Sequence, residues 1–467
     1  MFNKILGWIR SVVNKMFNVG IGSKFNVNVA ISDKMVTAIN LWEKMYKDEA
    51  PWLNEDVISS GLPAAISREF ATSTLVEFES EITGSPRADF LSERYKKLKK
   101  NLRKNLEYGC SLGGMVFKPY VANGQLLVDK VKGTNFFPIE YDSNEDCTAG
   151  IFVSRKIEGK YYFTRLEYHE LDVSNKKYVI KNKAYKSSTE ETLGQEISLK
   201  AVSDWADIQE EVHIENIEKP LFGYFRVPLA NTIDPDSPNG VSVYSRATEL
   251  IKEADKQFSR LLWEFEGSEL AIDADPTALQ QSKVMADKLE LPKLKERLFR
   301  AAGTNKDGKC FYEIFSPAIR ETELYKGFND ILKRIEFVCG LAYGTISDPE
   351  LIEKTATEII SAKQRSYATI SDIQIALEDA LEDTIYAMDV LATLYHLAPL
   401  GKYETSYEWD DSIIVDAKEE QAIMMQEANM GYIKKEIYLM KRYGVTEEQA
   451  KKMMPQQELE DTTKDEE

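Results

Sequence analysis

The stretch GTISDPELIEKTATEI, Gly344 to Ile359, decides how the second half of the chain is arranged. It contains a glycine, a proline and mixed charges, and it separates two segments whose apolar residues recur at helical spacing. Its side chains form no pattern typical of catalysis. We therefore expect a short polar loop at residues 346–355 between two long helices.

Both flanking segments are predicted to be helices with one apolar face. The preceding helix covers residues 321–345, and its face is formed by Leu324, Phe328, Ile331, Leu332, Ile335 and Val338 or Cys339. The following unit, 356–416, begins with a helix of roughly 40 residues, or ~60 Å, to about Leu397. Its face is formed by Ile370, Ile373, Leu377, Leu381, Ile385, Met388 and Ala392. The strand pattern YETSYEWDDSIIVD ends this unit.

A third long helix is predicted at residues 241–269, in VSVYSRATELIKEADKQFSRLLWEFEGSE. It would be about 26 residues, or roughly 40 Å, long. Its apolar residues are Ala247, Leu250, Ile251, Ala254, Phe258, Leu261, Leu262 and Phe265. Such lengths exceed what a compact domain needs, and sustained heptads of a coiled coil are missing from the sequence. We expect identical copies to pack side by side through Leu250, Phe258, Leu262, Phe328 and Ile335.

The N-terminal half, residues 1–240, is predicted to be helical first and β-rich afterwards. The last predicted helix, PRADFLSERYKKLKKNLRKNLEYG, ends at Gly109 and carries the basic residues Lys96, Lys97, Lys99, Lys100, Arg103 and Lys104. These residues indicate either a solvated helix face or a surface for an anionic partner or subunit. From Gly113 to Pro228, segments such as MVFKPYV and KYYFTRLEYHEL alternate with period two and predict an antiparallel meander. Helices followed by strands indicate an α+β fold.

The two ends of the chain give weaker patterns. MFNKILGWIRSVVNKMFN predicts an amphipathic helix, for which docking onto protein is favoured over a membrane surface. Residues 417–467 predict two short helices from Lys418 to about Met454 and an acidic tail, QQELEDTTKDEE, that is expected to be disordered.

Composition limits the possible functions. The 467 residues are 43% apolar, enough for a folded core, and 59 basic against 77 acidic residues give a net charge of −18. This charge disfavours tight, sequence-blind binding of a polyanion over the whole surface. The four cysteines form no CxxC pair and the three histidines are isolated in the sequence, so we predict no metal site and no disulfide framework.

Three short segments could carry chemistry, and each favours a structural interpretation. GTNKDGKC, Gly303 to Cys310, lies within the small mixed region 270–320 and resembles a phosphate-binding loop. Cys310 stands where a magnesium-binding Ser or Thr would be needed, so a hairpin turn is favoured. The pairs Asp234 with Asp236 and Asp410 with Asp411 are interpreted as a turn and a strand end. We therefore predict no catalytic residue, no cofactor and no enzyme activity, and a nucleotide-driven or nucleic-acid-processing enzyme remains the alternative.

The order of these parts resembles the portal proteins of tailed bacteriophages, especially those of phages and prophages of Gram-positive hosts. Similar strings include LPAAISREF, SEITGSPRADFL, LEYGCSLGG, PLANTIDPDSPNGVSVYSRA, ADKQFSRLLWEFEG, EFVCGLAYGTISDP, EKTATEI, KQRSYATISDIQ and YEWDDSIIVD. They extend from about residue 60 to residue 416. Their number and order, more than any single string, carry the resemblance.

The resemblance implies a portal fold. Residues 1–240 would form N-terminal helices and a wing, 241–269 and 321–345 two stem helices, and 270–320 a clip. Residues 346–355 would form a tunnel loop, 356–416 the long wing helix and wing strand, and 417–467 the crown and tail.

The resemblance also implies a function. Portals form a ring, usually of twelve copies, at one capsid vertex of the virion, and double-stranded DNA enters and leaves through the central channel. The implied partners are a terminase packaging motor, a head-completion or adaptor protein, and the major capsid and scaffold proteins, without a membrane. Assembly is expected in the cytoplasm of the bacterial host.

The tunnel loop would then line the narrowest part of the channel. The implied DNA-facing residues are Ser347, Asp348, Glu350, Glu353, Lys354 and Thr355. We expect Lys354 to contact phosphate while the three carboxylates oppose adhesion. The alternative is an ordinary helix-capping loop.

Overall fold

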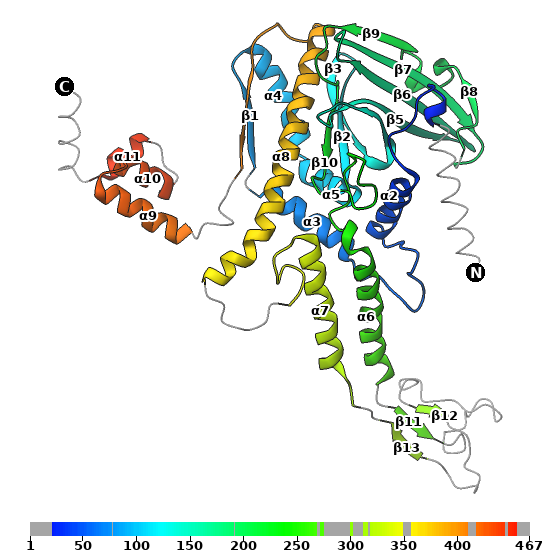
Figure 1. Cartoon of the computed structure of the whole chain (residues 1–467), viewed down its shortest axis with the longest axis vertical. Coiled ribbons are helices and arrows are strands. Elements are labelled where there is room, and N and C mark those ends of the chain that lie inside the picture. The colour runs from blue at the N-terminus through cyan, green and yellow to red at the C-terminus, as the bar shows by residue number, and fades with distance from the viewer. Residues whose placement is uncertain are drawn as a thin grey trace, which may run out of the picture.

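The computed structural model has an α+β architecture in which a broad wing continues into two long helices and a small distal sheet (Figure 1). It describes residues 21–76, 78–190, 192–268, 271–274, 299–301, 312–315, 318–348, 356–409, 417–443 and 447–454. The predicted N-terminal amphipathic helix, the string GTNKDGKC, Asp410 with Asp411 and the acidic tail lie outside these residues.

Four helices begin the wing: α2 (Asp33–Tyr46), α3 (Leu62–Thr74), α4 (Pro86–Lys99) and α5 (Leu102–Leu112). The Ser32 and Ser85 hydroxyls cap α2 and α4 by accepting N–H bonds from their first turns. The prediction of one basic helix ending at Gly109 was wrong, because residues 100 and 101 separate α4 from α5. Gly109 lies inside α5, where an added Cβ would come within 2.9 Å of the Phe225 ring, and Gly113 ends the helix at φ 87°.

The wing strands form two main antiparallel sheets. One has the order β10-β2-β3 and contains β2 (Gly114–Ala122), β3 (Gln125–Lys132) and β10 (Gly223–Arg226). The other sheet has the order β4-β5-β6-β7-β8, and β9 also pairs with β7. Its strands are β4 (Phe136–Tyr141), β5 (Cys147–Glu158), β6 (Tyr161–Asp172), β7 (Lys177–Ser187), β8 (Gln195–Ile197) and β9 (Glu211–Glu215). The predicted meander is confirmed from β4 to β7, whereas β2 and β3 belong to a separate sheet.

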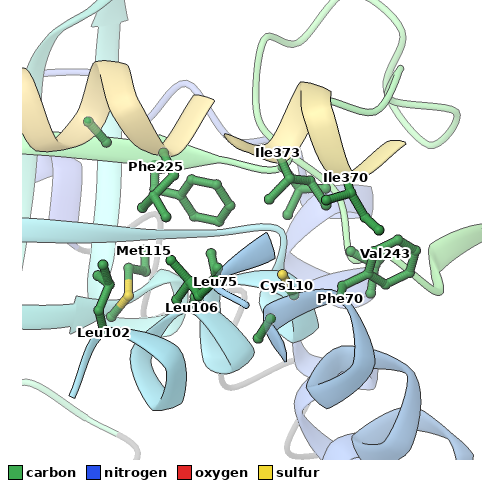
Figure 2. Close-up of a cluster of buried hydrophobic side chains, with 14 of the residues drawn as sticks. Phe70, Leu75, Leu102, Leu106, Cys110, Met115, Phe225, Val243, Ile370 and Ile373 are labelled. Carbon is green, nitrogen blue, oxygen red and sulfur yellow. The ribbon is translucent and has the colours of Figure 1, made fainter. Parts of the chain in front are cut away.

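The long helix α8 (Ala356–Leu394) crosses the wing and packs on β2 and β10. Its 39 residues match the predicted length, and all seven residues of the predicted face are buried. Figure 2 shows Ile370 and Ile373 of this helix above Phe70 and Cys110, with Phe225 and Met115 between the layers. After α8 the chain forms β14 (Glu404–Glu408), which pairs antiparallel with β1 (Glu79–Thr83).

The two projecting helices are α6 (Thr248–Gly267) and α7 (Glu321–Cys339), and they pack along one another. With 20 residues, α6 is shorter than predicted, because residues 241–247 form a turn and a short 3-10 helix. Tyr244 in this turn is buried and donates its hydroxyl to the Trp42 carbonyl at 2.9 Å. The turn therefore belongs to the wing core and fixes where α6 begins.

The distal sheet contains β11 (Ala271–Ala274), β12 (Phe299–Ala301) and β13 (Tyr312–Phe315). A hairpin turn at GTNKDGKC would pair β12 with β13, but β11 lies between them, parallel to β12 and antiparallel to β13. The described strands β12 and β13 are thus not paired with one another, and the turn predicted at GTNKDGKC lies outside the described residues.

The described residues between 417 and 454 form three helices, where two were predicted: α9 (Ala417–Met430), α10 (Lys435–Tyr443) and α11 (Glu447–Met453). Gly431, at φ 78°, ends α9.

A buried charged cluster connects the two wing sheets. Glu167 on β6 accepts bonds from Lys118 Nζ on β2 at 2.6 Å and from Arg165 Nη2 at 2.8 Å. Its other oxygen is 2.8 Å from Nε2 of His169, whose Nδ1 is 2.9 Å from the Tyr178 hydroxyl. Burial opposes the charge of Glu167, but the surrounding cations hold the pKa of this carboxyl well below its usual range. Burial lowers the pKa of His169, which keeps its ring neutral at pH 7.

Replacing Glu167 by Gln should lower the free energy of unfolding by about 3–5 kcal/mol, because Lys118 would remain buried without its counterion. Urea unfolding followed by circular dichroism measures the loss. The control is Glu211→Gln, whose carboxylate is 49% exposed and pairs with Lys181 at the surface. Equal unfolding midpoints for the two variants would contradict a structural role for the cluster.

Candidate channel loop and stem

The chain leaves the stem helix α7 through a fixed turn. Gly340 ends α7 in the left-handed conformation at φ 81°, and the Leu341 N–H bonds back to the Glu336 carbonyl at 2.9 Å. A Cβ at position 340 would lie 2.7 Å from Thr369 Oγ1 of α8. Glycine is thus required by both its backbone angle and the close approach of α8.

The buried carboxylate of Glu336 organises the beginning of the predicted tunnel loop. Its Oε1 accepts the N–H groups of Ile346 at 2.7 Å and Ser347 at 2.8 Å. Its Oε2 accepts the Gly344 N–H at 3.2 Å and the Ser347 hydroxyl at 2.8 Å. Glu336 has 0% exposure, so these four donors replace the water that a carboxylate would otherwise bind.

The next residue is held against α7 by side-chain bonds. The Asp348 N–H donates to Asn329 Oδ1 at 2.7 Å, and the Tyr325 hydroxyl donates to Asp348 Oδ2 at 3.1 Å. The latter bond raises the pKa of Tyr325. The chain therefore runs back along α7 as far as Asp348, which is exposed.

The predicted loop residues occupy different environments. Ser347 is 6% exposed and its hydroxyl is bound to Glu336, so it anchors the loop rather than offering a free side chain to DNA. Asp348 is exposed beside it. Glu350, Glu353, Lys354 and Thr355 lie outside the described residues.

The predicted stem-packing residues also divide into two groups. Phe258 and Phe328 join α6 to α7 with ring centroids 5.8 Å apart, while Ile335 is fully buried and Leu250 is partly buried against the wing core. Leu262, by contrast, is 38% exposed and is followed by Trp263 at 65%. The predicted apolar face of α6 is therefore not covered along its whole length by the described part of the same chain.

An ion pair joins α6 and α7 at the ends away from the wing. Arg320 donates Nε at 3.1 Å and Nη2 at 2.8 Å to the two carboxylate oxygens of Glu264, and its backbone N–H donates to Oε1 at 3.2 Å. Arg320 lowers the pKa of Glu264 through these hydrogen bonds. The pair fixes the spacing of α6 and α7 at the point where the chain enters residues 270–320.

A second buried carboxylate fastens the other stem helix to the wing. Asp255 of α6, 2% exposed, accepts Trp52 Nε1 at 2.8 Å, the Ser60 N–H at 2.8 Å and the Ser60 hydroxyl at 2.6 Å. These donors lie in the segment between α2 and α3. Neither Asp255 nor Glu336 was predicted as a functional residue, although each is an acidic residue directly beside a predicted apolar face, at Ala254 and Ile335.

The remaining candidate sites are the aspartate pair at Asp234 and a possible metal site. Asn231 Oδ1 accepts the N–H groups of Ile233 and Asp234, which confirms the turn predicted around Asp234. In the described ranges, no group of three or more His, Cys, Asp or Glu side chains could hold a metal ion. Among the helices that the structure describes, none is both long and apolar enough to cross a bilayer.

Comparison with known proteins identifies a family. Residues 89–464 match the family model described as phage portal protein, SPP1 Gp6-like. The match includes the stem helices, the distal sheet, α8 and the three C-terminal helices. No curated protein matches the chain.

Glu336→Gln should loosen the turn, because the amide that replaces Oε2 presents N–H groups to the Gly344 N–H. We expect a loss of about 1–3 kcal/mol of local stability, since the Gly344 N–H would keep only Ser347 Oγ, at 3.2 Å, as an acceptor and would face the new amide group. Hydrogen exchange measured by mass spectrometry should show faster exchange at residues 344–348. Asp330→Asn, at an exposed site on the same helix, is the control. Unchanged exchange at these residues would contradict the anchoring role of Glu336.

Proposed function

Because the chain belongs to the SPP1 Gp6-like phage portal family, whose members provide the DNA channel at a capsid vertex, we propose that about twelve copies form a closed ring around double-stranded DNA. The ring would serve both packaging and ejection of the genome. The family is structural, and the proposal assigns no catalytic step to the chain.

The observation that carries this proposal is the incomplete burial of the stem. Leu262, Trp263 and Phe265 near the end of α6 are 38%, 65% and 45% exposed, and Tyr325 on α7 is 47% exposed. The helix pair projects from the wing (Figure 1), so the described part of the chain offers these side chains little cover. Clusters of exposed aromatic and aliphatic side chains mark protein interaction sites. A ring would bury them between neighbouring stems.

The channel loop would connect Asp348, which lies beside α7, to Ala356 at the start of α8, and would point toward the axis of the ring. Asp348, Glu350 and Glu353 would keep its surface from adhering to DNA, while Lys354 would make a transient phosphate contact and Thr355 would lie at the end of the loop. We assign Ser347 to the anchor at Glu336. The net charge of the chain supports a weakly binding loop, since a chain at −18 repels DNA over most of its surface.

The remaining partners follow from the position of each part. Residues 270–320, beyond the stem, would meet the terminase packaging motor and later the head-completion or adaptor protein. The motor would supply the energy for DNA movement. The wing would contact the major capsid and scaffold proteins during assembly in the host cytoplasm.

Trp263→Glu should prevent ring formation, because it would place a charge inside the proposed stem contact. Native mass spectrometry should detect free subunits at concentrations where the unaltered chain forms rings, with assembly requiring at least roughly tenfold more protein. The control is Ile157→Glu in the wing, since Ile157 has the same 65% exposure. Normal rings from Trp263→Glu would contradict the stem contact.

Replacing both Glu350 and Glu353 by Lys should make assembled rings hold DNA. Each added phosphate contact steepens the dependence of log affinity on log salt by about 0.9. Filter binding of a DNA duplex across a salt series measures this slope. Glu321→Lys with Glu323→Lys makes the same charge change in the first turn of α7 and is the matched control. Equal slopes for the two variants would contradict a channel position for the loop.

A further inference from the structure

Two surfaces of opposite charge lie on neighbouring elements of the wing. The first, here called the acidic ribbon, is the exposed face of the β1–β14 pair and consists of Glu79, Glu81, Glu404 and Glu408. The second, here called the basic face, consists of Lys96, Lys97 and Lys100 at the end of α4 and Lys104 on α5, all exposed.

The register of the ribbon concentrates its charge. Glu79 is directly opposite Glu408, and Glu404 is opposite Thr83 on the same face. Directly opposed like charges destabilise an antiparallel pair. Within the described residues, none of the four carboxylates forms an ion pair within 4 Å, and Lys99 of α4 interacts electrostatically with Glu81 and Glu79. A cationic surface placed over the ribbon would offset this repulsion.

The two surfaces point in different directions. The other face of β1 packs on α4, where the Ser80 and Tyr95 hydroxyls lie 3.0 Å apart and Lys99 Nζ donates to the Ser80 carbonyl. Lys96, Lys97 and Lys100 lie on the side of α4 away from its buried residues Leu91, Tyr95 and Leu98. One subunit therefore cannot cover its own ribbon with its own basic face without unfolding α4 from β1.

The lysines are also available for a partner. Lys97 approaches Glu93 only to 3.9 Å, and within the described part of the chain Lys96, Lys100 and Lys104 form no ion pair. By contrast, Lys99 and Arg103 in the same region donate to the backbone carbonyls of Ser80 and Leu75. The free lysines are thus the ones that face outward.

We propose that the basic face of one subunit docks on the acidic ribbon of the next copy of this chain. Such a contact joins two different patches head to tail, which is the type of contact that closes a ring. The inference rests on the proposed ring and specifies where the wings meet. A second copy is favoured over DNA as the occupant because the same chain supplies a matching set of carboxylates, whereas its overall charge of −18 repels DNA.

Charge reversal on each surface gives a direct test. Variant one carries Lys96→Glu, Lys97→Glu and Lys100→Glu, and variant two carries Glu79→Lys, Glu81→Lys and Glu408→Lys. Each variant alone has two surfaces of the same sign and should need roughly tenfold or more protein to form rings. Mixed in equal amounts, they should form rings of alternating subunits, because every contact then joins opposite charges. Native mass spectrometry reads the subunit composition, and circular dichroism checks that each variant is folded.

The outcomes separate this inference from the proposed ring. If the unaltered chain forms rings and each variant alone does so equally well, the wing contact is overturned while the ring stands. If the mixture does not recover assembly although both variants are folded, the pairing of these two surfaces is overturned. Loss of DNA binding by variant one with normal assembly would identify the basic face as a nucleic-acid contact and would also overturn the proposal. Failure of the unaltered chain to form any ring would contradict the proposed function itself.

Discussion

Two buried carboxylates fix the ends of the projecting helices. Glu336 holds residues 344–347 to α7, and Asp255 holds α6 to the segment between α2 and α3. A buried carboxylate is costly unless donors surround it. Glu336 is matched by donors from residues 344–347, and Asp255 by donors from Trp52 and Ser60. Moving either segment away would leave a charge in the core without partners. Residues 344–347 are therefore fixed to α7, and α6 is fixed to the wing.

A fixed start for the loop would suit the proposed channel. The described chain lies beside α7 as far as Asp348, and Ala356 is the first residue of α8. The seven buried residues of the α8 face lie in the core, and α8 packs on the sheet β10-β2-β3 and on α3 and α4. In the proposed ring, residues 349–355 would lie near passing DNA, and their carboxylates would limit adhesion to this polyanion.

Periodicity was sufficient to predict the helices but not their junctions. The α8 face was correct at every predicted position, because a 3.6-residue apolar repeat over such a length has one structural solution. The basic helix was predicted as continuous because nothing in its pattern marks the interruption at Lys100, and Gly109 suggested an end where it instead allows Phe225 to approach. The short strands β1 and β10 find their partners far along the chain, which local patterns cannot reveal.

The candidate site was harder to predict than the fold. Resemblance indicated the loop, yet Ser347 is an internal anchor, and its partner Glu336 was hidden among the apolar residues of α7. A single acidic residue beside a buried stripe was the available signal, and its meaning depends on which backbone N–H groups approach it in three dimensions. The continuity of the apolar stripe on α6 gave no indication that its distal end is left exposed in one chain.

The central claim is that this chain functions as a ring. The most direct measurement is the mass of the purified full-length protein by native mass spectrometry, combined with class averages from electron microscopy. The account predicts a closed ring of about twelve copies with a central hole wide enough for a DNA duplex. A compact dimer with nucleotide-dependent activity would contradict it.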